Sequence, residues 1–478
     1  FPYTTLFRSS RSMVYTMPEF LERRYNPQSR TILSVISLVS YVLTKVAVTV
    51  YAGGLVFQQV FGIKELWGID FFWIAAIGLV VLTALYTIFG GMKSVLYTSV
   101  LQTPILLLGS LIILVLGFKE LGGWDEMMRV CGAVTVNDYG DTMTNLIRSN
   151  DDANFPWLGA LIGSAIIGFW YWCTDQFIVQ RVLSGKNEKE ARRGTIFGAY
   201  LKLLPVFLFL IPGMIAFALH QKYIGAGGEG FLPMLANGTA NADAAFPTLV
   251  AKLLPAGVKG LVVCGILAAL MSSLASLFNS SAMLFTIDFY KRFRPQTSEK
   301  KLVGIGQVAT VVIVILGILW IPIMRSVGDV LYTYLQDVQS VLAPGIAAAF
   351  LLGICWKRTS AQGGMWGLIS GMVIGLTRLG AKVYYSNAGE VADSTFKYLF
   401  YDMNWLFFCG WMFLFCIIVV IVVSLATEAP TAEKIQGLVF GTATKEQKAS
   451  TRASWNHWDI IHTVIILAIT GAFYWYFW

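Results

Sequence analysis

Apolar residues in this chain are grouped into long runs that are separated by shorter polar segments. Eleven runs have a length of about 20 residues or more, and they cover residues 31–60, 70–90, 94–117, 157–180, 195–219, 257–287, 302–324, 333–355, 362–380, 402–426 and 458–478. A helix of about 20 residues crosses the hydrocarbon core of a bilayer. The pattern therefore predicts an all-α, polytopic membrane protein with about eleven transmembrane helices.

The composition agrees with this pattern and limits the function. Of the 478 residues, 56% are apolar and 13% are charged, whereas about 25% of the residues are charged in soluble globular domains. This balance excludes a disordered chain, a nucleic-acid-binding module and an ordinary cytosolic enzyme. The sequence also lacks a phosphate-binding loop and a Ser/His/Asp set. We therefore predict a protein that is not an enzyme.

The charged residues predict an orientation. If the start of the chain is cytoplasmic, most of the 35 Lys and Arg residues fall in the loops on the cytoplasmic side. Such residues accumulate on that side of membranes. We expect a multi-pass protein of the cell membrane with a cytoplasmic start and an extracellular C-terminus. The net charge of +8 then reflects topology, and no nucleic-acid partner is expected. The cysteines and histidines show no spacing typical of disulfides or metal sites.

The start of the chain is unusual because it lacks both Met and a signal-peptide pattern. We interpret residues 1–12 as a non-native scar or a disordered start, and residues 13–478 as a single transmembrane domain. The polar linker 427–456 is too short to form a further domain.

Three ionisable residues within the predicted helices are candidate functional groups, because charge inside a membrane is costly. They are Lys45, Asp175 and Lys202. The alternative for each is snorkelling, in which the apolar stem stays in the membrane and the charged end reaches the interface. The residue types leave both interpretations open.

Aromatic and polar residues meet at the end of the fourth predicted helix, where Trp170-Tyr171-Trp172 is followed at once by Cys173-Thr174-Asp175-Gln176. Sugar rings stack on aromatic faces while their hydroxyls bind polar groups. This segment is therefore a candidate sugar site, and the alternative is an aromatic belt at the membrane interface.

Small residues mark two further helices. Ser272, Ser276 and Asn279 or Ser280 share one face of the sixth predicted helix. Their neutral oxygens suit a sodium ion, although taken alone the stripe favours helix packing. In the ninth predicted helix, glycines at positions 363, 367, 371 and 375 predict a close-packing face. The eighth is expected to break at Pro344-Gly345.

Six stretches resemble the sodium/solute symporter family and, within it, the sodium/glucose cotransporters. They are residues 15–21 (YTMPEFL), 97–103 (YTSVLQT), 170–181 (WYWCTDQFIVQR), 200–203 (YLKL), 271–281 (MSSLASLFNSS) and 350–358 (FLLGICWKR). The resemblance implies the LeuT-type fold, with two inverted five-helix repeats, discontinuous helices and alternating access. It also implies that the transporter domain lacks about three N-terminal helices, because the Pro-Glu-Phe motif follows a third helix in the family.

The resemblance implies roles for individual residues in substrate binding. By position, Tyr171 would be the aromatic gate under the sugar, with Trp172 beside it. Lys202 and Gln336 would form hydrogen bonds with the sugar hydroxyls.

For sodium, the resemblance implies the Ala269 carbonyl and the hydroxyls of Ser272 and Ser273 as ligands. Glucose-type members carry Asp where this chain has Ser99, and some carry Thr where it has Ala275. Those positions are associated with a second sodium, so we predict one sodium per sugar.

The resemblance therefore implies sodium-driven symport of a glucose- or galactose-like hexose, with sodium as the co-transported ion and no organic cofactor. The expected partners are the sugar, sodium and the lipid bilayer. Gly168 and Thr333 replace polar or acidic residues of relatives, which leaves the identity of the sugar open. The alternatives are another small polar solute, such as inositol, an amino acid or an anion, and a symporter-like membrane sensor.

Overall fold

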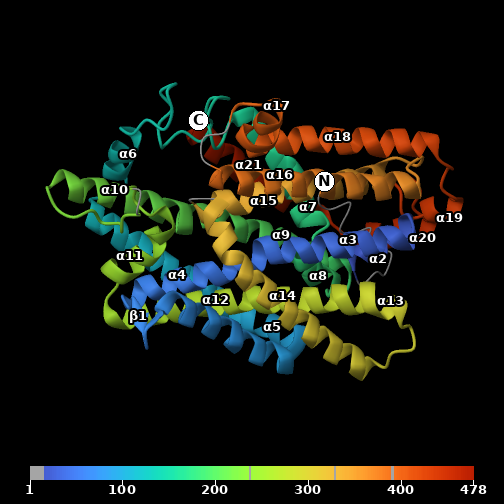
Figure 1. Ribbon diagram of the computed structural model, residues 1–478, viewed down its shortest axis with the longest axis horizontal. Coiled ribbons are helices and arrows are strands. Elements are labelled where there is room, and N and C mark those ends of the chain that lie inside the picture. The colour runs from blue at the N-terminus through green and yellow to red at the C-terminus, as the bar shows by residue number, and fades with distance from the viewer. Residues whose placement is uncertain (1–15, 236–237, 328–329, 389–391, 478) are drawn as a thin grey trace. The chain divides into compact units, whose positions relative to one another are not determined.

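The computed structural model describes residues 16–235, 238–327, 330–388 and 392–477 (Figure 1). These residues are mostly helical, and the predicted scar at residues 1–12 lies outside them. In chain order the elements are α2 (Met17–Arg24), α3 (Pro27–Ser40), η1 (Tyr41–Val46), α4 (Ala47–Phe61), β1 (Glu65–Leu66), β2 (Ile69–Asp70), α5 (Phe71–Leu121), α6 (Trp124–Gly132), α7 (Trp157–Cys173), α8 (Gln176–Leu183), α9 (Glu188–Pro205), η2 (Val206–Leu210), α10 (Ile211–Gly225), η3 (Ala242–Ala244), α11 (Ala245–Leu253), α12 (Ala256–Met283), η4 (Leu284–Tyr290), α13 (Lys291–Phe293), α14 (Glu299–Val327), α15 (Leu331–Cys355), α16 (Ala361–Asn387), α17 (Thr395–Lys397), η5 (Tyr398–Asp402), α18 (Trp405–Ala426), α19 (Ala432–Ile435), α20 (Lys445–Ser454) and α21 (His457–Tyr476).

The chain divides into two compact units, and each unit is built from segments that are distant in the sequence. The first unit consists of Phe1–Lys45, Asn150–Gly198 and Ser280–Leu467, and the second of Val46–Ser149, Ala199–Asn279 and Ala468–Trp478. The single transmembrane domain expected from the sequence stays a prediction.

In the first unit, α15, α16 and α18 pack against one another, and α7 packs on α15 and α18. Figure 1 shows α16 and α18 lying alongside each other. The short helix α2 is attached to this core by ring stacking of Phe20 on Phe350, whose centroids are 5.9 Å apart. The Tyr25 hydroxyl also donates a hydrogen bond to the carbonyl of Ala349. The start of the described chain is therefore held by α15.

In the second unit, α5 packs on α4 and α10, and α11 packs on the same group. Buried apolar residues such as Ile113, Ile215 and Leu249 form its core. The strands β1 and β2 make a hairpin between α4 and α5. Its turn is Trp67-Gly68, in which both residues have positive φ, as a two-residue hairpin turn requires.

Helix starts in the first unit follow from local sequence. The Thr16 hydroxyl accepts a hydrogen bond from the backbone N–H of Glu19, and the Asn26 side chain accepts one from that of Ser29. Each of these caps precedes a proline in the first turn, where the missing N–H costs nothing. Together they define two separate helices, α2 and α3.

Eight helices among the described residues are long and apolar enough to cross a membrane, or nine if the bent pair α7–α8 is counted as one span. The prediction was about eleven. The glycine-rich α16 coincides with the predicted span 362–380 but lies outside that set.

The predicted spans 70–90 and 94–117 are wrong as separate helices, since α5 continues through both. The expected loop between them, residues 91–93, contains Gly91 and Lys93. A glycine inside a helix costs only about 1 kcal/mol relative to Ala, which does not suffice to end a long apolar helix. Within α5, Gln102–Leu121 is apolar enough to span, and Phe71–Leu85 is a shorter apolar segment.

The predicted break at Pro344-Gly345 is also wrong, because α15 is continuous from Leu331 to Cys355. Both residues are buried, and a Cβ on Gly345 would lie 2.9 Å from the Cα of Gly371 in α16. Packing on both sides of the helix outweighs the cost of about 3 kcal/mol for an internal proline.

The glycine repeat of α16 forms the predicted close-packing face. A Cβ would lie 2.6 Å from the Cα of Gly345 at Gly371, and 2.3 Å from the carbonyl oxygen of Val341 at Gly375. At Gly367 it would lie 2.4 Å from a methyl group of Val420 in α18. Glycine is therefore required because the backbones of α15 and α16 approach so closely.

We expect Gly371→Ala to destabilise the protein by about 1–3 kcal/mol, the usual cost of overpacking a tight core. The matched control is Gly380→Ala in the same helix, where a Cβ meets no atom within 4 Å and should be neutral or slightly stabilising. Thermal unfolding of the detergent-solubilised protein tests this. Equal shifts in the two melting temperatures would contradict the packing argument.

Candidate functional site

The fourth predicted span is interrupted at Thr174–Asp175, where α7 ends and α8 begins at an angle of 46°. The Thr174 hydroxyl donates a hydrogen bond to the carbonyl of Trp170, 2.7 Å away. The Asp175 carboxylate caps α8 by accepting a hydrogen bond from the N–H of Phe177. The local sequence Cys-Thr-Asp-Gln thus ends one helix and starts the next, as capping residues do.

Asp175 is also half of a buried ion pair with Lys45 of η1. The side chain of Lys45 is only 9% exposed, and that of Asp175 only 2%. The hydroxyl of Tyr41, one turn before Lys45, donates a hydrogen bond to the same carboxylate at 3.0 Å. The sequence singled out Lys45 and Asp175 separately. The structure shows that they neutralise each other, so neither needs to snorkel.

Aromatic rings surround the ammonium group of Lys45. Four ring centroids lie 4.3–5.8 Å from its Nζ atom, those of Tyr41, Trp170, Tyr171 and Phe177. Rings at this distance attract a cation through their negative faces and keep water away. The predicted gate residue Tyr171 is therefore part of the same cluster as the buried pair.

The predicted substrate residues are divided between the two units. Tyr171 and Trp172 form the last turn of α7 with ring centroids 5.2 Å apart, and Trp172 is 39% exposed. Gln336, on α15, belongs to the same unit and is half-buried. Lys202 lies on α9 in the second unit and is exposed.

The predicted sodium ligands Ala269, Ser272 and Ser273 all lie on α12 in the second unit. Ser272 is buried and Ser273 is exposed. The hydroxyls of Ser272 and Ser99 are hydrogen-bonded at 2.5 Å, which joins α12 to α5. The Ser276 hydroxyl donates to the carbonyl of Ser272. Part of the serine stripe therefore joins helices, as the helix-packing interpretation predicts.

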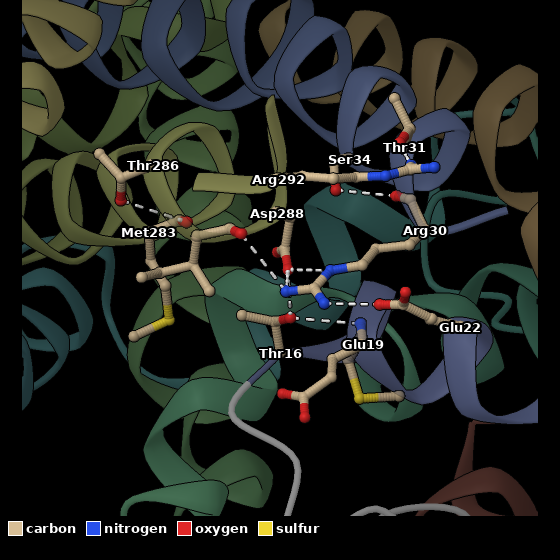
Figure 2. Close-up of polar contacts among 12 residues, drawn as sticks. Thr16, Glu19, Glu22, Arg30, Thr31, Ser34, Met283, Thr286, Asp288 and Arg292 are labelled. Carbon is tan, nitrogen blue, oxygen red and sulfur yellow. Dashed lines mark hydrogen bonds and ion pairs between the residues drawn. The ribbon is translucent and has the colours of Figure 1, made fainter. Parts of the chain in front are cut away.

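Sequence reasoning missed Asp288, which lies just beyond the predicted span 257–287. The helix continues through η4 to Phe293, and Asp288 is fully buried. Figure 2 shows its carboxylate receiving hydrogen bonds from Arg30 Nε at 2.7 Å and from the Thr16 hydroxyl at 2.9 Å. Arg30 also binds Glu22 at 2.6 Å. This network ties α2 and α3 to η4, and no local pattern links residues so distant in sequence.

Two further charged residues lie inside predicted spans without having been singled out, Asp337 in α15 and Arg378 in α16. Asp337 forms ion pairs with both Arg378 and Lys382. The signal was available in the sequence, since each is an ionisable group within an apolar run.

A family model described as "Sodium:solute symporter family" matches residues 4–371. The chain belongs to this family. Its members are transporters rather than enzymes, and sodium is the coupling ion named by the family. The resemblance stated from the sequence motifs is therefore confirmed.

Curated relatives of this symporter are similar over most of the chain. The sodium/mannose cotransporter of Bos taurus is 35% identical over 98% of this chain and 81% of its own length. The sodium/myo-inositol cotransporter 2 of Homo sapiens is 36% identical, and the sodium/glucose cotransporter 4 of Mus musculus is 35% identical, each over 90% of this chain. The chain spans 64% and 63% of those two relatives.

A solved structure of a Na⁺-coupled sialic acid symporter, in a substrate-bound, outward-open state, has a TM-score of 0.67 to this symporter. It is 20% identical in sequence and covers 89% of this chain and 80% of its own. This likeness confirms the prediction of an all-α, polytopic membrane protein with the LeuT-type fold.

Neutralising one member of the Lys45–Asp175 pair should destabilise the protein strongly. Asp175→Asn or Lys45→Met leaves an unpaired buried charge, at a cost of about 3–5 kcal/mol. The double variant removes both charges and should be more stable than either single variant. Thermal stability and the yield of monodisperse protein measure this.

The control for these variants is Glu190→Gln, which breaks the exposed pair of Glu190 with Arg193 and should change stability by less than about 1 kcal/mol. Destabilisation of the double variant by the sum of the two single effects would show that the charges do not compensate each other.

Proposed function

We propose that this chain carries out sodium-driven symport of a hexose such as glucose or galactose, by alternating access and with one sodium per sugar. The observation that carries the proposal is the α7–α8 break. It sets the half-buried ring of Tyr171 beside the buried Lys45–Asp175 pair, and the exposed ring of Trp172 lies next to Tyr171. The relatives named for mannose, myo-inositol and glucose support a polyhydroxylated ring as the solute.

The proposed sugar site uses two kinds of contact. The face of Tyr171 would stack on the C–H face of the sugar ring, which is the usual role of an aromatic ring in carbohydrate binding. Gln336 and Lys202 would form hydrogen bonds with hydroxyl groups, since an amide offers both donors and an acceptor while an ammonium offers donors. Trp172 would close the side of the site.

The proposed sodium site uses the Ala269 carbonyl with the Ser272 and Ser273 hydroxyls. Ser99, where glucose-type members carry Asp, is a neutral residue bound to Ser272, so it supplies no carboxylate for a second ion. One charge moving through 100 mV contributes about 2.3 kcal/mol. A tenfold sodium gradient adds about 1.4 kcal/mol. The two together support accumulation of the sugar on the order of 10²–10³-fold.

We further propose that the protein lies in the cell membrane with its start in the cytoplasm and its C-terminus outside. The uneven distribution of Lys and Arg between alternate loops supports this orientation.

A second candidate is symport of myo-inositol, which is favoured by the relative with 36% identity. Inositol also presents a ring with C–H faces and several hydroxyls, so the same aromatic and polar contacts would serve it. Competition of each solute with labelled glucose distinguishes the two candidates.

We expect labelled glucose or galactose to accumulate in proteoliposomes containing the full-length protein only when a sodium gradient is present. Tyr171→Ala should reduce uptake at least about tenfold, because stacking and water exclusion at the gate are lost. The matched control is Tyr398→Ala in η5, an exposed tyrosine that should retain uptake. Sugar uptake unaffected by Tyr171→Ala would exclude this aromatic site.

The charge moved per sugar should be one. Current and labelled uptake measured together in the same voltage-clamped membrane determine this ratio, and a Hill coefficient near one for sodium should accompany it. A ratio of two charges per sugar would refute the single sodium site.

A further inference from the structure

A cluster of three charged side chains lies directly beside Gln336, and we call Asp337, Arg378 and Lys382 the Asp337 cluster. The ammonium of Lys382 donates a hydrogen bond to Asp337 Oδ2. The Nη2 atom of Arg378 lies 3.8 Å from Asp337 Oδ1. The exposed fractions of these side chains are 13% for Asp337, 20% for Lys382 and zero for Arg378. Two cations on α16 therefore share one carboxylate on α15.

Arg378 is fixed in place by elements other than α15. Its guanidinium donates hydrogen bonds to the carbonyls of Leu399 at 3.2 Å and Met403 at 2.6 Å. It also lies 4.1 Å from the centroid of the Phe408 ring. Because η5 and α18 hold the Arg378 guanidinium in one position, it can in turn hold the Asp337 carboxylate.

Polar side chains attach the first turns of α15 to other segments of the chain. The helix begins after Val330 with no side-chain cap. Besides Asp337, the buried Tyr334 holds this end, since its hydroxyl donates to the carbonyl of Leu43 at 2.9 Å and accepts from the indole N–H of Trp320 at 2.6 Å. Tyr334 and Asp337 are three residues apart, and Gln336 lies between them.

We propose that Asp337 is a positioning residue for Gln336, and that its attachment to Lys382 and Arg378 sets the direction in which the Gln336 amide points toward the substrate. Successive residues of a helix are separated by about 100° around its axis. Tyr334 and Asp337 are therefore about 60° apart on one face of α15, and Gln336 lies about 100° from Asp337. Anchoring the side chains of Tyr334 and Asp337 fixes the rotation of this turn, and with it the direction of Gln336. The inference rests on the proposed contact between Gln336 and a sugar hydroxyl.

The charge balance of the Asp337 cluster makes its members unequal. Removal of Asp337 takes away the carboxylate that the two cations of the cluster share. Removal of Lys382 leaves Arg378 to neutralise Asp337. Both Asp337 Oδ1 and Arg378 Nε are buried without a hydrogen-bond partner among the described residues, so the two groups have unused capacity to bind each other. Removal of the Asp337 carboxylate should therefore weaken sugar binding more than removal of the Lys382 ammonium.

The test is sodium-driven sugar uptake by the full-length protein in proteoliposomes. Asp337→Asn should raise the KM for sugar by about tenfold, an ordinary size for coupling between contacting residues. The maximal rate should stay within about twofold, because only substrate binding is weakened. Lys382→Met should raise the KM by about threefold or less. Asp337→Glu, which retains the charge, should recover most of the affinity.

The decisive comparison combines Asp337→Asn with Gln336→Ala. If Asp337 acts through Gln336, the double variant has the KM of Gln336→Ala alone. An additional tenfold loss in the double variant would overturn the inference and leave the proposed contact intact. An unchanged KM in Gln336→Ala alone would instead overturn the contact itself, and the inference with it.

A variant that fails to fold does not end the test. If Asp337→Asn gives no monodisperse protein, Lys382→Met is combined with Gln336→Ala in the same cycle. Independent effects of Lys382→Met and Gln336→Ala on the KM would contradict the inference, whereas a KM equal to that of Gln336→Ala would support it.

Discussion

Charge buried within a membrane protein has to be neutralised inside the protein, and the Lys45–Asp175 pair shows how this constraint shapes the site. The carboxylate is available because α7 ends at Cys173 and a new helix starts at Gln176. At that break Asp175 caps α8, pairs with Lys45 and accepts a hydrogen bond from Tyr41. The break, the ion pair and the position of the Tyr171 ring therefore depend on one another, since loss of any charge leaves the other unsolvated.

The same constraint recurs at two other places in the first unit. Asp288 is buried and bound by Arg30 and Thr16, which attaches α2 and α3 to η4 (Figure 2). The Asp337 cluster attaches α15 to α16. In each case a carboxylate near a helix end meets a cation from a distant segment. Lipid is as apolar as the side chains, so apolar contacts do little to fix how helices in a bilayer are oriented toward one another. These polar contacts fix that orientation instead.

The contacts of the Asp337 cluster require the backbones of α15 and α16 to lie close together. Gly371 and Gly345 bring α16 and α15 together, and Arg378 and Lys382 follow on the same helix, α16. The glycine face and most of the predicted spans could be read from the chain, because periodicity and hydropathy are local properties. The continuity of α5 and of α15 could not, since an internal Gly or Pro is tolerated only where surrounding helices stabilise the segment.

The sequence by itself determined the membrane class, the helical architecture, the family and the residue types of the candidate site. Those conclusions rest on apolar runs and on short motifs such as Trp-Tyr-Trp-Cys-Thr-Asp-Gln, which are continuous in the chain. Only the tertiary structure decided which charges pair, because Lys45 and Asp175 are 130 residues apart and Arg30 and Asp288 are 258 residues apart. Charge pairing across such distances depends on which helices lie against each other, and no local pattern specifies the partner of a helix.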